Sequence, residues 1–320
     1  MTDPTNRGEA AILPRHIDST MITAFRACPR KFYNEFVLGH RPVEIGPDLH
    51  AGGCFATALE AFYRTYFTRP GTPTHRLELG RIAAIKAFTA AWGLYEPPAN
   101  HIKTQGNVWL ALEQYLETYP PHTDHIQPYL NHDGEPMLEY TFAIPLEEGF
   151  PHHPDGDAFL LCGRFDMLGT YHGRPCIKDE KTTKYAGATW ADQWNLRNQF
   201  LTYVWACQQS GFPTLNTAVI RGVIIQKTNP RQVEAIKVYP PHLISRWYDQ
   251  LRRDLHRLRR AWDDDHWDFN LGETCTNYGL CPFMTSCQAL DPMLWLKDLP
   301  ILRWDPLHRD PTQPTEPVHA

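Results

Sequence analysis

The sequence predicts an α/β protein in which a central mixed sheet is flanked by helices. Residues 159–168 are mostly apolar and are separated from residues 176–181 by the turn residues His172, Gly173, Arg174 and Pro175, which is typical of a hairpin. Residues 138–144 alternate between apolar and polar, and residues 218–227 form a nearly continuous apolar run. Helical apolar stripes stand before and after these strands, so both element types contribute to one core.

Length and composition limit the kinds of protein that this chain could be. The chain has 320 residues, of which 42% are hydrophobic, and can therefore bury a substantial core. The net charge of −5 gives no overall sign of a nucleic-acid partner, although a local basic groove is compatible with it. Residues 1–14 are polar and no stretch is apolar enough to span a membrane, so we expect a cytoplasmic protein. In that compartment the eight cysteines are expected to be reduced or metal-bound.

The expected organisation is a single domain over residues 16–300 between two tails. Residues 1–15 are rich in polar and turn residues, and residues 301–320 are rich in proline. Inside the domain we expect an inserted helical lobe at about 40–135 and a catalytic sheet core at about 136–240. A long helix and a cysteine cluster follow at about 241–300.

The first helices have clear boundaries. Asp18, Ser19 and Thr20 are good N-cap residues, and the dipeptide Cys28-Pro29 separates that helix from a second one that ends near Gly39. In the lobe, a helix over residues 54–66 is expected to begin after a Gly-Gly pair, and two more are expected over residues 76–95 and 107–119.

The remaining elements complete the sheet. We expect a helix over residues 189–209, strands over 218–227 and 232–239, and a long helix over 242–264. The last helix carries a run of arginines that is either a solvated basic face or a surface that follows a phosphate backbone. These arginines are Arg246, Arg252, Arg253, Arg257, Arg259 and Arg260.

Two acidic residues and a lysine fall at the ends of the two hairpin strands. Asp166 ends one strand, and Asp179 and Lys181 lie two residues apart on the other, so their side chains share a face. A surface hairpin with solvated charges is the simplest explanation. If the charges are buried, a divalent cation such as magnesium compensates them, because hard cations take oxygen ligands. Lys181 would then stabilise the charge that develops on a phosphate attacked by water.

Three cysteines, Cys275, Cys281 and Cys287, lie at equal spacings in a segment rich in turn residues. They are either small buried hydrophobic side chains or ligands of a metal centre. Zinc and iron–sulfur sites usually need four ligands, and Cys28 is the best fourth candidate on local grounds. Spacing alone does not distinguish zinc from iron–sulfur.

Taken together, these motifs resemble those of the PD-(D/E)xK nuclease superfamily, with its restriction-endonuclease-like core. Within it the chain is most similar to the RecB-like exonucleases that include CRISPR-associated and phage-encoded members. The resemblance spans about residues 16–290 and consists of five matches in order: Ser19 or Thr20 to Cys28-Pro29 and Phe32; Gly163 to Asp166; Asp179 to Lys181; Gln199 with Tyr203; and Cys281-Pro282-Phe283.

The resemblance implies a metal-dependent DNA exonuclease of recombination, repair or phage and CRISPR-related DNA processing. Asp166, Asp179 and the main-chain carbonyl of Glu180 would bind Mg²⁺ or Mn²⁺, and Lys181 would be the catalytic lysine. Gln199 and Tyr203 would help to place a DNA end or single strand. The candidates for a basic DNA-binding cleft are Lys178, Lys181, Lys184, Arg197 and the arginines of the long helix, with a solvated surface as the simpler explanation for most of them. It also implies a [4Fe–4S] cluster on the four cysteines named above, with structural Zn²⁺ as the alternative, and a helicase or recombination protein as a further partner.

The sequence departs from the family pattern at two places. Family members commonly carry a histidine in a pattern like G-x-x-x-H-x-x-L-E; here Gly52, Leu59 and Glu60 match, but Ala56 stands at the histidine position. Glu60 is therefore a candidate substitute metal ligand or a structural ion-pair partner. Five residues separate Cys275 from Cys281, where the family often has two. The alternative functions are a catalytically weak or inactive DNA-binding scaffold, and a metal-stapled interaction module in a larger complex.

Overall fold

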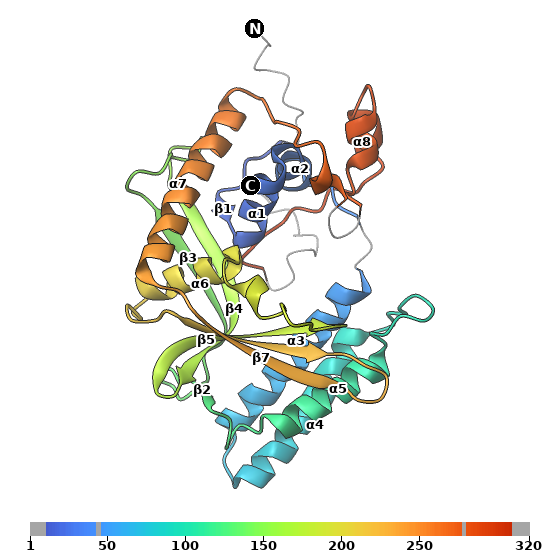
Figure 1. The fold of residues 1–320 in the computed structure, drawn as a ribbon, viewed down its shortest axis with the longest axis vertical. Helices are drawn as coiled ribbons and strands as arrows, with labels where there is room; N and C mark the ends of the chain where they lie inside the picture. The colour runs from blue at the N-terminus through green and yellow to red at the C-terminus, as the bar shows by residue number, and fades with distance from the viewer. Residues whose placement is uncertain (1–10, 43–45, 277–279, 309–320) are drawn as a thin grey trace. The chain divides into compact units, whose positions relative to one another are not determined.

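The computed structural model describes residues 11–42, 46–276 and 280–308 (Figure 1). Its contacts divide the chain into two compact units. One comprises residues 1–44, 141–163 and 245–320, and the other comprises residues 45–140 and 164–244. Most of the two predicted tails lies outside the described residues; within the described part of the first, Leu13 is buried. No helix in the described ranges is long and apolar enough to cross a membrane.

The second unit is built on a mixed sheet, as the sequence predicts. β4 (Phe159–Tyr171) pairs antiparallel with β5 (Arg174–Thr183), β5 pairs parallel with β6 (Thr217–Ile224), and β6 pairs antiparallel with β7 (Arg231–Val238). β2 (Ile126–Pro128) and β3 (Leu138–Leu146) also pair with β4. β3 and β4 continue into the first unit, where β1 (His16–Ile17) pairs parallel with β4.

The hairpin between β4 and β5 has a shorter turn than the sequence indicates. Arg174 already belongs to β5, so the turn consists of His172 and Gly173 alone. Both residues have left-handed backbone conformations, with φ of 49° and 76°. Such a two-residue turn matches the twist of the flanking strands, and it fixes the register that brings Asp166 opposite Asp179.

The parallel pairing of β5 with β6 requires a crossover connection, and helix α6 (Asn198–Gln209) supplies it. The predicted helix over residues 189–209 is therefore wrong in its first half, which contains only a 3₁₀ turn, η3 (Asp192–Trp194). The Trp194 carbonyl accepts a hydrogen bond from the Tyr239 hydroxyl at 2.7 Å. The indole ring of Trp194 packs edge-on against that of Trp190. Tertiary packing of these aromatic residues overrides the helical pattern.

Three helices cover the opposite face of this sheet from α6 (Figure 1). They are α3 (Pro47–Thr68), α4 (Pro73–Trp92) and α5 (Gln105–Thr118), close to the three helices predicted for the lobe. α3 begins seven residues before the predicted start and contains both Gly52 and Gly53. Pro47 at its first turn is the start signal, because proline needs no hydrogen-bonded N–H there. Their buried faces form one core with residues of β4, β5 and β6, such as Met167, Cys176 and Val219.

The first unit contains the N-terminal and C-terminal helices. α1 (Ser19–Ala27) is capped by Asp18, whose carboxylate accepts from the Met21 amide at 2.7 Å, and α2 (Pro29–Phe32) runs into a π-helical turn, η2 (Tyr33–Val37). The long helix α7 (Pro241–Asp263) contributes residues from 245 onward. Shorter segments follow: η4 (Glu273–Cys275), α8 (Met284–Gln288) and α9 (Met293–Leu296).

Candidate functional site

The two candidate metal-binding carboxylates lie on adjacent strands in the second unit. Met167 of β4 is paired with Lys178 of β5, so the next position of this antiparallel ladder brings Asp166 opposite Asp179. The amide N–H of Glu180 donates a hydrogen bond to Asp166 Oδ2 at 2.9 Å. The hairpin therefore brings together the two carboxylates that are thirteen residues apart in the sequence.

Lys181 extends from the same side of β5 as Asp179. Its ammonium group lies 2.5 Å from Asp179 Oδ1, and its side chain is 30% exposed, whereas that of Asp179 is 1% exposed. Burial alone would lower the pKa of Lys181, but the charges of Asp179 and Asp166 raise it above its ordinary value. The lysine is thus held positively charged at the solvent edge of the site.

Burial raises the pKa of both aspartates. For Asp166, the negative charge of Asp179 raises the pKa further, and Glu180 and Glu139 act in the same direction. For Asp179, desolvation is the largest cause, and Lys181 opposes it without cancelling it. Two carboxylates thus share one lysine, and when both are ionised an additional cation would neutralise the remaining negative charge.

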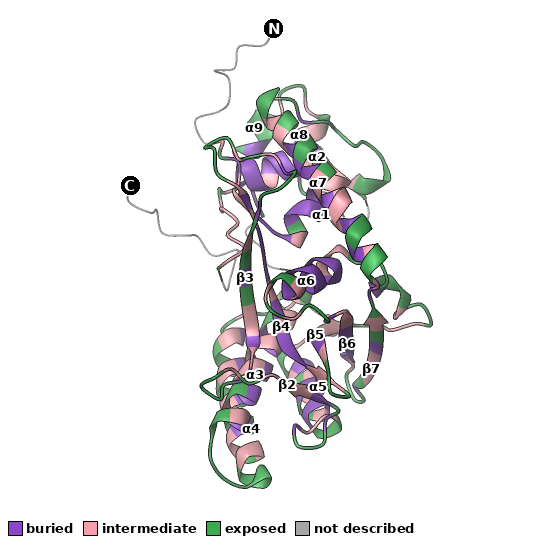
Figure 2. Ribbon diagram, turned by 90° about the vertical axis from the view of Figure 1, so that its left-hand side faces the viewer, coloured by how far each residue is buried: buried purple, intermediate pink, exposed green. Residues whose placement is uncertain are grey.

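Gln199 and Tyr203 of α6 reach the same face of the sheet. Gln199 Nε2 donates to the Tyr203 hydroxyl at 3.0 Å and makes a longer contact of 3.4 Å with Asp179 Oδ2. Tyr203 packs against Phe165 on β4, with ring centroids 5.6 Å apart. Residues 200–207 of the helix are buried, and this packing holds the two polar groups in place (Figure 2).

The side chains of Lys178 and Glu180 point to the opposite face of β5, as strand alternation requires. Lys178 is 1% exposed and its ammonium group contacts Glu180 Oε1 at 2.5 Å. The sequence suggested Lys178 as a basic residue of a DNA cleft, and this prediction is wrong because the side chain is buried beneath the sheet. The main-chain N–H of Glu180 donates to Asp166, and Glu180 also lines the pocket beside Asp166.

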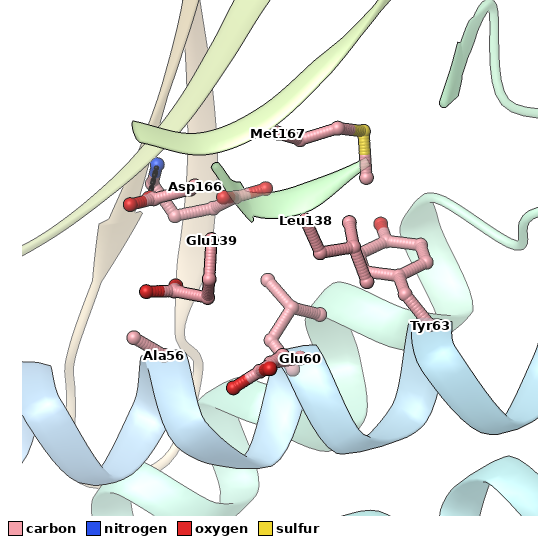
Figure 3. A pocket seen from close by; sticks show the side chains of 9 residues that line it. Ala56, Glu60, Tyr63, Leu138, Glu139, Asp166 and Met167 are labelled. Atoms are coloured by element: carbon pink, nitrogen blue, oxygen red, sulfur yellow. Dashed lines mark hydrogen bonds between the residues drawn. The ribbon is translucent and has the colours of Figure 1, made fainter. Parts of the chain in front are cut away.

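A pocket beside Asp166 contains the position where the family histidine is missing. Ala56 and Glu60 of α3 and Glu139 of β3 line it together with Asp166 (Figure 3). The Glu60 carboxylate is paired with Arg64 at 2.8 Å, one helical turn away. Glu60 thus combines a structural ion pair with a place in the pocket, and Ala56 leaves room where a larger side chain would stand.

Glu139 is a pocket residue that the sequence did not suggest. Its φ of 49° is unusual for a glutamate within a strand and costs on the order of 1 kcal/mol. Its carboxylate pairs with Arg164 at 2.8 Å. The alternating pattern of residues 138–144 predicts the strand but contains no sign of this backbone conformation.

The four cysteines of the predicted cluster lie near one another in the first unit. Burial raises the pKa of the Cys281 thiol, and Cys275 and Cys28 raise it further. Burial likewise raises the pKa of Cys287, with contributions from Cys281, Cys28 and Cys275. Each of the four thiols is partly exposed. Cys275, Cys281 and Cys287 thus lie close to Cys28 at the α1–α2 junction.

Several other basic residues that the sequence suggested for DNA contact have partners within the protein. Lys184 is 3.1 Å from Asp48, and Arg197 lies 6.0 Å from the ring of Trp194. Three of the α7 arginines pair with acidic residues of the same helix, which supports a solvated ion-paired face for them. These pairs are Arg252–Asp249, Arg257–Asp254 and Arg259–Asp263.

Within the described ranges, no group of three or more His, Cys, Asp or Glu side chains is arranged to hold a metal ion. The aspartate site offers two carboxylates and one main-chain carbonyl, a donor set of hard oxygen atoms. The cysteine site offers four thiols. Both metal centres remain predictions.

Comparison with known proteins identifies the family. The family model described as the PD-(D/E)XK nuclease superfamily matches residues 19–288. Among solved structures, a candidate exonuclease from Eubacterium rectale has a TM-score of 0.45 and 12% identity, covering 83% of this chain and 89% of its own. The protein SSO0001 has a TM-score of 0.33 and 12% identity, covering 87% and 92%. No curated protein sequence matches. On the strength of the family match, this chain belongs to the PD-(D/E)XK nuclease superfamily.

Proposed function

We propose that this protein is a metal-dependent deoxyribonuclease, and specifically an exonuclease that hydrolyses phosphodiester bonds at DNA ends or in single strands. The observation that carries the proposal is the apposition of Asp166, Asp179 and Lys181 on two paired strands. Three charges in a largely buried position are costly to maintain without a function. Together with the family, this arrangement favours catalysis over an inactive scaffold.

Asp166, Asp179 and the carbonyl of Glu180 would hold Mg²⁺ or Mn²⁺, with Glu60 as a candidate further ligand. The cation would neutralise charge on the phosphate and lower the pKa of the attacking water. Lys181 stabilises the charge that develops on the phosphate oxygens, because its ammonium group is held charged at the solvent edge. Gln199 and Tyr203 limit the orientations of the Asp179 carboxylate and are available to contact the DNA strand.

Replacing Lys181 with alanine tests this proposal. We expect wild-type protein to degrade end-labelled single- or double-stranded DNA with Mg²⁺ or Mn²⁺, and Lys181→Ala to lose on the order of 100- to 1,000-fold in kcat. Lys184→Ala, which removes an exposed lysine of the same segment, is the matched control and should change kcat little. Product lengths over time distinguish stepwise removal of nucleotides from internal cleavage.

The alternative is a DNA-binding scaffold, and Ala56 at the family histidine position is the observation that favours it. If purified wild-type protein binds DNA but cuts no substrate with either cation, the scaffold takes precedence over the nuclease. Retention of a helicase or recombination protein during purification would further support a role within a DNA recombination or repair complex.

We also propose that Cys28, Cys275, Cys281 and Cys287 hold a [4Fe–4S] cluster, with Zn²⁺ as the alternative. Protein purified without oxygen should contain about four iron atoms per chain and absorb visible light, and Cys281→Ala should lose both. The control is Cys207→Ala, which removes a buried cysteine of α6 outside the group. About one zinc per chain without colour would establish the alternative, and the absence of both metals would contradict a metal centre.

A further inference from the structure

The side of β5 that faces away from Asp179 and Lys181 carries a buried polar network. Lys178 donates to the Tyr63 hydroxyl of α3 at 3.0 Å and pairs with Glu180. The Tyr115 hydroxyl of α5 donates to the same oxygen, Glu180 Oε1, at 2.6 Å. The Glu180 side chain is therefore held by two donors, and it is only 5% exposed.

This network continues across the sheet. Arg221 of β6 is paired with Glu180 in the parallel register, and its Nη1 lies 3.4 Å from the Tyr115 hydroxyl. The guanidinium is fully buried and makes two hydrogen bonds to Asp124, at 2.6 and 2.7 Å. Tyr115 thus stands between two buried ion pairs and contacts both.

Such a network is not what core stability alone would favour. A buried ion pair can often be replaced by apolar side chains of similar volume without loss of stability, because desolvation offsets the attraction of the charges. Its place in this chain is specific: Glu180 is the residue whose amide N–H donates to Asp166 and whose neighbours are Asp179 and Lys181. Fixing the Glu180 side chain fixes the peptide group that orients Asp166.

We propose that Tyr115 is a positioning residue, which acts through Glu180 to hold the Asp166 carboxylate in the orientation needed for the divalent cation. This inference rests on the proposed nuclease function and adds to it a residue of the helical lobe, on the other side of the sheet from Lys181. Partners that orient metal ligands typically contribute 10- to 100-fold to metal affinity or activity.

The test compares Tyr115→Phe with Tyr66→Phe. Both remove one buried phenolic hydroxyl, but the Tyr66 hydroxyl has no hydrogen-bond partner among the residues that the structure describes. Mn²⁺ binding is measured without DNA, by the loss of the electron paramagnetic resonance signal of free Mn²⁺, and cleavage is measured separately. We expect Tyr115→Phe to weaken Mn²⁺ binding 10- to 100-fold and to lower kcat with little change in KM, while Tyr66→Phe matches wild type.

A second variant distinguishes loss of the positioning network from a folding defect. Lys178→Met combined with Glu180→Met removes both charges together, so that neither is left buried alone, and the protein is expected to remain folded. We expect it to weaken Mn²⁺ binding as Tyr115→Phe does. If the wild type binds Mn²⁺ and cuts DNA while Tyr115→Phe behaves like Tyr66→Phe, the positioning role is overturned. If the wild type itself neither binds Mn²⁺ nor cuts, the nuclease proposal fails.

Discussion

Replacing Asp179 with asparagine is expected to abolish DNA cleavage and, without metal, to leave the protein at least as stable as the wild type. The pKa of Asp179 is raised by burial, with Lys181 opposing, so folding disfavours the ionised carboxylate relative to the unfolded chain. An acid whose pKa is raised on folding reduces stability at pH values above that pKa. Asparagine keeps the shape and removes the buried charge, whereas kcat should fall at least about 100-fold.

The measurement has two parts. Cleavage of end-labelled DNA gives kcat, and thermal unfolding in EDTA gives the stability of the metal-free protein. Adding Mg²⁺ should then raise the unfolding temperature of the wild type but not of Asp179→Asn, because a ligand at about 100 times its Kd stabilises the folded state by about 2.7 kcal/mol. Asp192→Asn, which alters a largely exposed aspartate of the same unit, serves as the control.

The contradicting outcomes are distinct. Activity within a few-fold of the wild type would remove Asp179 from the catalytic site. A loss of several kcal/mol of stability in EDTA would show that the ion pair with Lys181 stabilises the fold more than burial of the charge destabilises it.

The hairpin that carries the candidate site could be predicted because its signals are local. Turn residues at 172–175 and strand alternation placed Asp179 and Lys181 on one face, and the structure agrees. The mixed character of the sheet was also predicted, and the helix between two of its strands makes the parallel crossover from β5 to β6. Gln199 and Tyr203 were placed on one helical face by their spacing alone.

What the sequence did not provide depends on long-range contacts. The first half of the predicted 189–209 helix is replaced by a turn because Trp194 packs against Trp190 and its carbonyl accepts from Tyr239, 45 residues away. The strained backbone of Glu139 and its pairing with Arg164 likewise arise from packing between strands. No local pattern encodes these features.

The sequence contains one sign of the buried ion pairs, but it does not identify the partners. Arg221 interrupts the apolar run of β6, and a fully buried arginine needs buried acidic partners. The sequence shows that such partners must exist. Asp124 lies before β2 and Glu234 lies on β7, so only the tertiary structure identifies them.

Replacing Arg221 with methionine is accordingly expected to cost about 3–5 kcal/mol of stability at neutral pH, because Asp124 and Glu234 would remain without their cation. Burial alone would raise the pKa of Asp124. The hydrogen bonds and charge of Arg221 lower it by more, so the pKa lies below its ordinary value in the wild type. A carboxylate with a lowered pKa stabilises the folded state above its unfolded pKa, and this contribution is lost as pH falls through the folded pKa.

In Arg221→Met, the contribution of Asp124 to stability is expected to change with pH in the opposite direction. The pKa of Asp124 is expected to rise because the hydrogen bonds and charge of Arg221 are lost, while Lys178 and the Ile126 amide only partly offset burial. Protonation of Asp124 as pH falls then removes the buried charge that destabilises the variant. The difference in unfolding free energy between wild type and variant, measured with urea, should therefore be largest near pH 7 and should narrow toward pH 4. Arg231→Met, on the adjacent strand β7 and exposed, should change stability by less than about 0.5 kcal/mol.

A triple variant separates loss of the cation from loss of packing. Arg221→Met combined with Asp124→Asn and Glu234→Gln leaves no buried charge in the group, and it should recover most of the stability lost by Arg221→Met alone. A single-variant loss below about 1 kcal/mol, or a pH-independent difference, would mean that the aliphatic part of Arg221 and its stacking on Tyr119, at 3.6 Å from the ring centre, dominate its contribution. The ion pairs would then add little to the stability of the sheet beneath Glu180.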